Sequence, residues 1–334
     1  MGASRNKSSA DPVLQAVAAC VSRSVAAGDT VVVGYSGGLD STVLLHAAHT
    51  LARNGRFELS AIHVHHGLSP NAETWCHFCA ETCAALGLPI ELVKVEVIPW
   101  HGEGIEAGAR RVRHKALVDH PGKWKMLAHH ADDQAETLVL NLLRGTGVRG
   151  AAAIPASHGR ILRPFLTISK ALLQKYADSH HLVWIEDESN DYCRFSRNYL
   201  RANIFPSLSA RFPNAVAQLS AAAGRFGEAS SLLDDLARLD LAGRPATFPM
   251  PLALLRELPE PRVRNLLRAM LSWQGMQSPD EARLKEFVRQ LRSAGPGRKP
   301  RLDLVVYSLW CEAGLLSFRP GTQDSAVSGS VPNN

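Results

Sequence analysis

Hydrophobic and polar positions follow two different spacings along the first part of the chain. Short apolar runs rich in β-branched residues are typical of buried strands, whereas apolar residues spaced three or four apart are typical of helices that face a core. The segment from Pro12 to about Ala27 has the helical spacing, and "TVVVGY" (30–35) has the composition of a buried strand. After a glycine-rich turn, an apolar stripe from Val43 to Leu51 predicts a second helix.

Strands and helices continue to follow one another to about residue 187. The expected strands are "ELSAIHVHHG" (58–67), "IELVKVEV" (90–97), a segment ending near His129, the short piece "ILRPFL" (161–166) and "LVWIED" (182–187). The expected helices cover 71–87, about Asp132 to Arg144, and Ser169 to His180. Strands that alternate with helices pair in parallel, because each connection crosses over a face of the sheet. We therefore predict an α/β fold with a mostly parallel sheet and helices on both faces.

A long helical pattern over about 215–241 separates this region from a smaller one. Residues 243–319 contain three helical patterns and then two strand patterns, which indicates a small α+β domain. The predicted organisation is an N-terminal helix with a disordered leader (1–28), the α/β domain (29–218), a connecting helix (219–242), the small domain (243–319) and a tail (320–334). The tail is polar and rich in Gly, Ser and Pro, so we expect it to be disordered.

Composition narrows the class of protein. No run of about 18 apolar residues is present, so no membrane partner is expected, and the first residues lack the apolar core of a secretory signal. A cytoplasmic protein is the resulting expectation. The net charge is +6, and basic residues cluster at 109–115, 122–125 and 295–301. One such cluster often lies simply in a solvated face, but three together favour a nucleic-acid partner.

The loop "SGGLDS" between the first strand and the second helix has the features of an anion-binding turn. Glycines permit positive φ and close backbone approach, and the N–H groups at a helix start attract an anion. The loop lacks the lysine of a Walker-type loop, and an aspartate beside phosphates suggests that Mg²⁺ lies between them. A simple turn capped by serine is the alternative. The candidate ATP-binding residues are Ser36, Gly37, Gly38, Leu39, Asp40 and Ser41.

In this position, "SGGLDS" resembles the signature of the PP-loop ATP pyrophosphatases, whose fold is of the adenine nucleotide alpha hydrolase type. The resemblance implies that ATP is cleaved between its α- and β-phosphates, that an oxygen of the substrate is adenylated, and that pyrophosphate leaves. A leaving pyrophosphate can be held by backbone donors and Mg²⁺, without the lysine that steadies a transferred γ-phosphoryl group.

Four further stretches, in this order, resemble the tRNA(Ile)-lysidine synthetase (synthase) family over about residues 29–215. They are "HVHHGLSPNA", "GIEAGARRVRHKAL", "AHHADDQAETLVLNLLRGTGVRG" and "WIEDESNDYCRFSRNYLRANIFPSL". The family's reaction adenylates C2 of the wobble cytidine of a CAU-anticodon isoleucine tRNA, and free L-lysine then displaces AMP to give lysidine. ATP, Mg²⁺, this tRNA and lysine are therefore the expected ligands, and a homodimer stays open. His114 stands where the family usually has Tyr, and "EDESN" where it has "EDPSN".

The resemblance also nominates reacting groups. Asp133 and Glu136 lie one helical turn apart, where a carboxylate pair suits holding a lysine ammonium and taking its proton. Asp132 is a candidate for Mg²⁺ or for a helix cap, and an acidic start to an amphipathic helix is the plain alternative for the whole group. His129 and His63 lie at strand ends, where open α/β sheets keep their sites. Three arginines match family positions that could hold the α-phosphate or a tRNA phosphate, namely Arg110, Arg197 and Arg201.

Other interpretations compete with this one. Cys76, Cys79 and Cys83 could ligate an iron–sulfur cluster as in PP-loop tRNA thiolases, although their spacing also forms one buried helical stripe. Five histidines at two strand ends could suggest zinc, but their spacing misses the usual ligand patterns; they are His63, His65, His66, His129 and His130. A tRNA-binding homologue without catalytic activity is the alternative from outside the enzymes.

Overall fold

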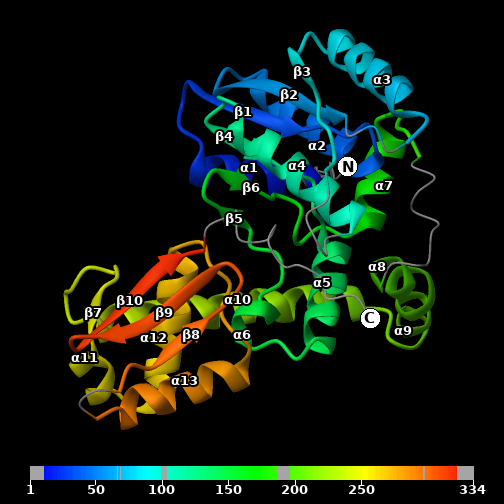
Figure 1. The fold of residues 1–334 in the computed structure, drawn as a ribbon. Helices are drawn as coiled ribbons and strands as arrows, with labels where there is room; N and C mark the ends of the chain where they lie inside the picture. Colours follow the sequence, from blue (N-terminus) through cyan, green and yellow to red (C-terminus); the bar gives the residue numbers. More distant parts are fainter. Residues whose placement is uncertain are drawn as a thin grey trace, which may run out of the picture. The chain divides into compact units, whose positions relative to one another are not determined.

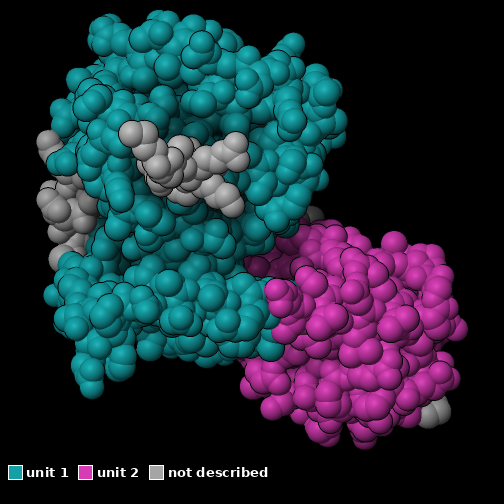
Figure 2. Space-filling view, turned by 180° about the vertical axis from the view of Figure 1, so that it is seen from behind, with its two compact units in different colours: residues 1–227 teal, residues 228–334 magenta. Residues whose placement is uncertain are grey.

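The computed structural model describes residues 11–65, 67, 69–98, 104–186, 196–295 and 298–321. Residues 1–10, in the segment where the disordered leader was expected, and most of the expected tail lie outside the described residues. The chain divides into two compact units, residues 1–227 (unit 1) and 228–334 (unit 2), which Figure 2 shows in different colours. The division falls inside one long helix, and the finer domain boundaries expected from the sequence stay a prediction.

Unit 1 is built on a six-stranded sheet. Its strands lie in the order β3 (Ile90–Lys94), β2 (Phe57–His65), β1 (Asp29–Gly34), β4 (Trp124–Met126), β6 (Ile161–Leu162) and β5 (Ser157–His158). All neighbours are parallel except β5, which pairs antiparallel with β6 at the edge. Val33 of β1 is paired with Ala61 of β2 and with Met126 of β4. The predicted mostly parallel α/β sheet is therefore confirmed.

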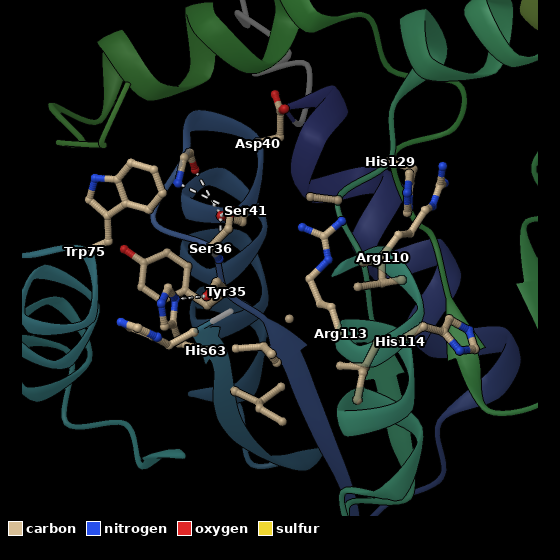
Figure 3. Close-up of a pocket in the computed structure, with 18 of the residues that line it drawn as sticks. Tyr35, Ser36, Asp40, Ser41, His63, Trp75, Arg110, Arg113, His114 and His129 are labelled. Atoms are coloured by element: carbon tan, nitrogen blue, oxygen red, sulfur yellow. Dashed lines mark hydrogen bonds between the residues drawn. The ribbon is translucent and has the colours of Figure 1, made fainter. Parts of the chain in front are cut away.

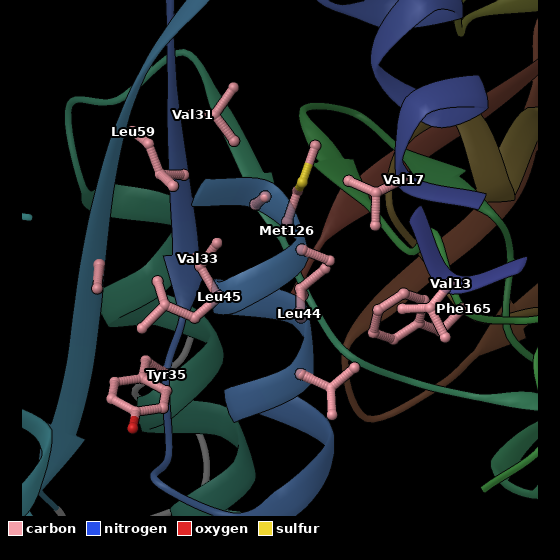
Figure 4. Packing of buried hydrophobic residues seen from close by; sticks show 14 of the residues in the cluster. Val13, Val17, Val31, Val33, Tyr35, Leu44, Leu45, Leu59, Met126 and Phe165 are labelled. Carbon is pink, nitrogen blue, oxygen red and sulfur yellow. The ribbon is translucent and has the colours of Figure 1, made fainter. Parts of the chain in front are cut away.

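Helices cover both faces of this sheet because its strands are apolar on both sides (Figure 1). The helices that follow or precede its strands are α1 (Pro12–Ser24), α2 (Leu39–Ala52), α3 (Ala72–Ala85), α4 (Ile105–Asp119) and α7 (Lys170–Ser179). Val31 and Val33 belong to the core formed with α1, α2 and α7 (Figure 4). Val32 points the other way and packs with Leu117 of α4. This alternation along β1 fixes the two layers of helices.

The order of the strands places a functional site at one edge. From β1 the chain moves outward through β2 to β3, then returns to β4 on the opposite side of β1. Ligands of open α/β sheets bind at such a reversal point, beyond the carboxyl ends of the strands. The glycine loop follows β1 and leads into α2, and the histidine–aspartate segment follows β4 and leads into α5 (Ala131–Leu143). These two segments must therefore meet.

A group of helices packs around α5. It consists of α6 (Val148–Ala151), α8 (Ser196–Tyr199), the π-helical turn η2 (Leu200–Ile204), α9 (Phe205–Arg211) and α10 (Ala215–Asp240). Ala135 of α5 packs with Leu200 and Phe205, and Leu138 packs with Ala223 of α10. The segment with the sequence "RNYLR" is helical and runs from α8 into η2.

The prediction of a strand at 182–187 is wrong, because residues 182–186, the part of this segment that the structure describes, form no strand. Leu182 and Trp184 pack against the core of unit 1 while Val183 is 70% exposed, and this alternation imitates a strand. The segment instead crosses the glycine loop, where the Ile185 N–H donates to the Gly37 carbonyl at 2.9 Å. The sheet edge beside β6 is taken by β5, so the segment has no strand to pair with there.

Unit 2 is a small α+β unit, as predicted. An antiparallel sheet contains β7 (Met250–Pro251), β10 (Leu315–Pro320), β9 (Tyr307–Glu312) and β8 (Arg301–Asp303), in that order. The end of α10 and the helices α11 (Leu252–Glu257), α12 (Glu260–Trp273) and α13 (Glu281–Ser293) share a separate core with this sheet. No helix among the described residues of either unit is long and apolar enough to cross a bilayer.

Candidate functional site

The glycine loop is held in shape by its own hydroxyl groups. The Ser36 and Ser41 hydroxyls lie 3.0 Å apart, and Ser41 Oγ also donates to the Gly38 carbonyl at 3.0 Å. Gly37 has φ +85°, and a Cβ there would lie 2.9 Å from Ile185 Cδ1. Gly37 therefore cannot be replaced without strain, whereas Gly38, at φ −75°, simply caps α2. Leu39 is buried at the first position of α2.

A cavity of about 410 Å³ opens beside this loop, at the carboxyl ends of β1, β2 and β4 (Figure 3). The predicted residues that line it are Ser36, Gly38, Asp40, Ser41, His63, Arg110, His129 and Asp133. Trp75, Tyr35 and His63 lie on one side, and the cations of α4 lie on the other. The His63 ring is buried and fixed by its Nδ1, which lies 2.9 Å from the Tyr35 carbonyl. Nucleotide-binding and reacting groups expected from distant motifs thus share one cavity.

One wall of the cavity is strongly cationic. Arg110, Arg113 and His114 lie on one face of α4, and His129 and Arg163 follow the ends of β4 and β6. Burial lowers the pKa of His129 to about 4; the Asp133 charge opposes this shift, while Arg163 and Arg110 reinforce it. Burial and the nearby arginines likewise lower the pKa of His114. Both imidazoles are therefore neutral at pH 7, and the arginines carry the charge of this wall.

Three carboxylates converge on His130, which the sequence analysis had considered only as a zinc ligand. Its ring nitrogens lie 3.5 Å from Asp40 Oδ2, 3.4 Å from Asp132 Oδ2 and 3.6 Å from Asp133 Oδ2. Burial lowers the pKa of His130, but hydrogen bonds to Asp132 and Asp40 outweigh burial and raise it to about 10. An imidazolium thus joins the glycine loop to the start of α5.

The two aspartates of α5 have different surroundings. Asp132 Oδ2 accepts the Lys170 backbone N–H at 2.8 Å and so helps to cap α7, a helix other than its own. Asp133 Oδ2 accepts a hydrogen bond from the backbone N–H of His130 at 3.1 Å, and Asp133 also lines the cavity. Burial raises the pKa of Asp133, but the charge of His130, the hydrogen bond from the His130 backbone and the charge of Arg197 outweigh burial and lower the pKa overall. Asp133 is therefore an anion at neutral pH.

Glu136 is buried and paired with two arginines. Arg201 Nε and Nη2 donate to Glu136 Oε1 and Oε2 at 2.8 and 3.0 Å, and Arg197 Nε lies 3.4 Å from Oε2. Arg197 also donates to the Thr137 hydroxyl. Arg201 Nη2 lies 3.6 Å from Asp133 Oδ1, so the cluster reaches the cavity through Asp133.

Several site residues were not nominated from the sequence. Arg113 and His114 belong to the basic cluster at 109–115, whose charge was the only signal. Arg163 follows the end of a strand, and the tendency of open α/β sheets to keep their sites at strand ends applies to it as it does to His129. Trp75 and Ile185 carry no sequence signal, because only the fold brings α3 and the 182–186 segment to the loop.

The cysteines pack as the helical-stripe interpretation predicted. Cys79 and Cys83 are completely buried in the core of unit 1, and Cys76 is 6% exposed. Cys79 Sγ lies 3.4 Å from His63 Nδ1 inside the protein. In the described part of the chain, no group of three or more His, Cys, Asp or Glu side chains is arranged to hold one metal ion; His66 lies outside that part.

Comparisons with known proteins identify the family of this chain. Residues 11–208 match the family model of the PP-loop domain, and residues 250–316 match that of the TilS substrate binding domain. The chain is 42% identical over 306 residues to the tRNA(Ile)-lysidine synthase of Alkalilimnicola ehrlichii, covering 90% of this chain and 67% of that one. It is 44% identical over 313 residues to that of Pseudomonas aeruginosa, covering 88% and 70%.

The chain is shorter than these relatives. It is 47% identical over 277 residues to the tRNA(Ile)-lysidine synthase of Aromatoleum aromaticum, covering 82% of this chain but 65% of that one. Across the relatives compared, it spans between 58% and 70% of their length.

Among solved structures, the U34-tRNA thiolase NcsA from Methanococcus maripaludis with its [4Fe-4S] cluster has a TM-score of 0.54. It is 18% identical, and the match covers 65% of this chain and 78% of that one. At this identity the likeness concerns the fold alone.

Proposed function

Because this chain belongs to the tRNA(Ile)-lysidine synthase family of PP-loop proteins, we propose that it makes lysidine. In the proposed reaction, ATP adenylates O2 of the wobble cytidine of CAU-anticodon isoleucine tRNA, and L-lysine displaces AMP at C2. The observation that carries the proposal is the meeting of the glycine loop with Asp133 and His129 in one cavity. One end of the cavity suits a leaving pyrophosphate, and the other holds an anion suited to an ammonium group.

The glycine loop is the proposed pyrophosphate site. The N–H groups of the loop and the first turn of α2 point to the same end of the helix, where its dipole favours an anion. Ser36 and Ser41 add hydroxyl donors beside them. Nothing in this step requires a Walker-type lysine, because the β- and γ-phosphates leave together instead of being transferred.

Asp40 is the proposed Mg²⁺ ligand. Its Oδ1 is buried without a hydrogen-bond partner among the described residues, as expected of an oxygen that a cation can take up. Asp132 fits less well, because its Oδ2 already accepts from the Lys170 backbone. Mg²⁺ commonly uses one or two carboxylates together with substrate phosphates. When bound, the ion would neutralise charge on the leaving pyrophosphate.

Asp133 is the proposed contact for the lysine ammonium and the acceptor of its proton. It is anionic, lines the cavity and lies next to neutral His129. For Glu136 we now propose a different role from holding the ammonium, because both of its oxygens accept from Arg201. Glu136 then positions Arg197 and Arg201 beside Asp133, where the two arginines can contact phosphate.

Unit 2 is proposed to contact tRNA, since its residues 250–316 match a substrate-binding family model. The substrates tRNA, ATP and free lysine meet in the cytoplasm, where we expect the protein to act. A homodimer is compatible with this scheme and is not required by it. A thiolase is not favoured, because Cys79 and Cys83 are enclosed in the core and the similar curated relatives are lysidine synthases.

The proposal is tested with labelled lysine, ATP and a CAU-anticodon isoleucine tRNA transcript. We expect label in the tRNA together with equal amounts of AMP and pyrophosphate. A transcript with uridine at the wobble position is the matched control and should accept no lysine. Binding of tRNA without release of AMP would identify a homologue without catalytic activity, and AMP release without lysine incorporation would indicate a different acceptor.

A further inference from the structure

Arg163 stands out in the cavity because its guanidinium is only partly engaged. It follows β6 immediately, at the carboxyl end of the parallel sheet. Its Nη1 donates to the Pro155 carbonyl at 2.9 Å, which fixes the plane of the group. Its Nε is buried, and no acceptor among the described residues reaches it. Buried polar groups without a partner are uncommon in proteins and are frequently completed by a ligand.

The charges around Arg163 favour the binding of an anion. Among the described residues that line the cavity, the carboxylates are Asp40 and Asp133, and both of these lie against His130. Arg163 instead lies near Arg110, whose charge, together with burial, lowers its pKa. The charges of these two guanidinium groups repel each other within one cavity, an anion bound there would relieve the repulsion, and their planar forks match the oxygens of a phosphate.

The position of Arg163 selects one phosphate of the nucleotide. With pyrophosphate at the glycine loop after β1, the α-phosphate must extend toward the groups that follow β4, where lysine is to be held. Arg163 follows β6, the strand paired with β4, and its charge acts on His129. We propose that Arg163, with Arg110, binds the α-phosphate of the nucleotide and stabilises the negative charge on it during adenylation. The stabilising role during adenylation rests on the proposed function, whereas the binding of the α-phosphate does not depend on it.

The step is balanced without any further reactant. The cytidine O2 forms a bond to the α-phosphorus while the bond from that phosphorus to the bridging oxygen breaks, and pyrophosphate leaves. Arg163 donates hydrogen bonds to a non-bridging oxygen throughout and exchanges no proton. Fixed donors aimed at oxygens whose charge changes in the transition state are an efficient source of catalysis.

The test compares Arg163→Gln and Arg163→Lys with Arg160→Gln. Arg160 is an exposed arginine just before β6, so its replacement removes the same charge without touching the cavity lining. Calorimetry on the full chain measures the affinities for AMP, adenosine and inorganic pyrophosphate. Arg163→Gln should weaken AMP binding roughly 10- to 100-fold, the usual effect of losing one hydrogen bond to a charged group. The affinities for adenosine and pyrophosphate, and all affinities of Arg160→Gln, should change by less than about twofold.

Arg163→Lys keeps the positive charge but loses the planar guanidinium group. Its affinity for AMP should therefore lie between those of Arg163→Gln and Arg160→Gln. It also decides the matter if Arg163→Gln does not fold. Equal losses for AMP and adenosine, a loss for pyrophosphate, unchanged AMP binding, or a loss confined to tRNA binding would each overturn the proposal. The last outcome would assign Arg163 to a tRNA backbone phosphate. The affinity for tRNA is measured separately, whereas the measurements with AMP, adenosine and pyrophosphate need neither tRNA nor lysine, so they stand whether or not lysidine is formed.

Discussion

At the scale of single residues, the site separates two carboxylates that the sequence places in one short motif. Asp132 and Asp133 are adjacent, yet one caps α7 and the other faces the cavity. The His130 ring lies within 3.6 Å of both and of Asp40, so its positive charge offsets part of the negative charge gathered there. The division of work between Asp40 at the nucleotide and Asp133 at lysine can therefore be tested one residue at a time.

We expect Asp40→Ala and Asp133→Asn to abolish lysine incorporation at different steps. Without Asp40, the leaving pyrophosphate loses its metal ligand, so tRNA-dependent exchange of pyrophosphate into ATP should fall by at least about 100-fold, the scale of losing one strong transition-state contact. Asp133→Asn should retain that exchange and lose lysine transfer, because the charge that is proposed to hold the ammonium is removed while Asp40 and the glycine loop are unchanged. Circular dichroism checks that both variants fold. Near-normal lysidine formation in either one would contradict the assigned role.

His129 predicts how stability depends on pH. An unfolded histidine takes up a proton near pH 6.5, whereas His129 in the folded protein resists protonation down to about pH 4. The unfolded state therefore binds more protons between these values, and stability falls as the pH falls. From pH 7.5 to 5 the loss due to this residue is about 2 kcal/mol. Urea unfolding of His129→Gln should be less sensitive to pH by that amount, while His158→Gln, at an exposed site, should behave as the parent protein.

At the scale of elements, the sequence predicts those parts whose signals are local. The strand–glycine–helix unit around Gly37 and the long helix α10 appear as expected, because β-branched runs, helical spacing and glycine act over a few residues. The error at 182–187 has the same origin. Leu182, Val183 and Trp184 alternate as in a strand, but whether an alternating segment joins a sheet depends on a free strand edge elsewhere in the chain.

Contacts between elements were the part that the sequence could not supply. Glu136 and Arg201 are separated by 65 residues, and Arg163 joins the site only because β6 lies next to β4. The sequence motifs place Glu136 and Arg201 in the site, but they give the arginines no position, so a substrate ammonium is the partner they suggest for Glu136. Such pairings depend on the packing of α8 and η2 against α5, which no local pattern specifies.

The Glu136 pair predicts a measurable coupling between α5 and η2. Glu136→Gln removes the charge that holds Arg201 while leaving the shape, and we expect a loss of about 1–3 kcal/mol in the free energy of unfolding. The Arg201 side chain is 38% exposed, and solvent screening of its charge weakens the pair, so the range extends down to about 1 kcal/mol. A double-mutant cycle with Arg201→Met measures the coupling by urea unfolding. Additive effects within about 0.5 kcal/mol would show that the pair does not link the two elements.

At the scale of the whole molecule, each unit has its own hydrophobic core. The core of unit 1 gathers around β1 and α2, and that of unit 2 gathers around α12 and β9. The cavity with the glycine loop and Asp133 is lined by residues of unit 1. Nucleotide chemistry and the proposed tRNA contact therefore depend on cores that can be perturbed separately.

Leu266→Ala provides that perturbation in unit 2. Leu266 is completely buried on α12, so the truncation should cost about 2–5 kcal/mol through lost burial and a cavity. We expect calorimetry to show an early transition for unit 2, while the affinity for ATP at lower temperature stays within twofold. Lysidine formation should fail at the temperature of that transition, because unit 2 is proposed to hold the tRNA. Leu239→Ala, at a site 73% exposed in the same unit, is the matched control and should change little. Loss of ATP binding in Leu266→Ala would mean that the two units act as one cooperative structure.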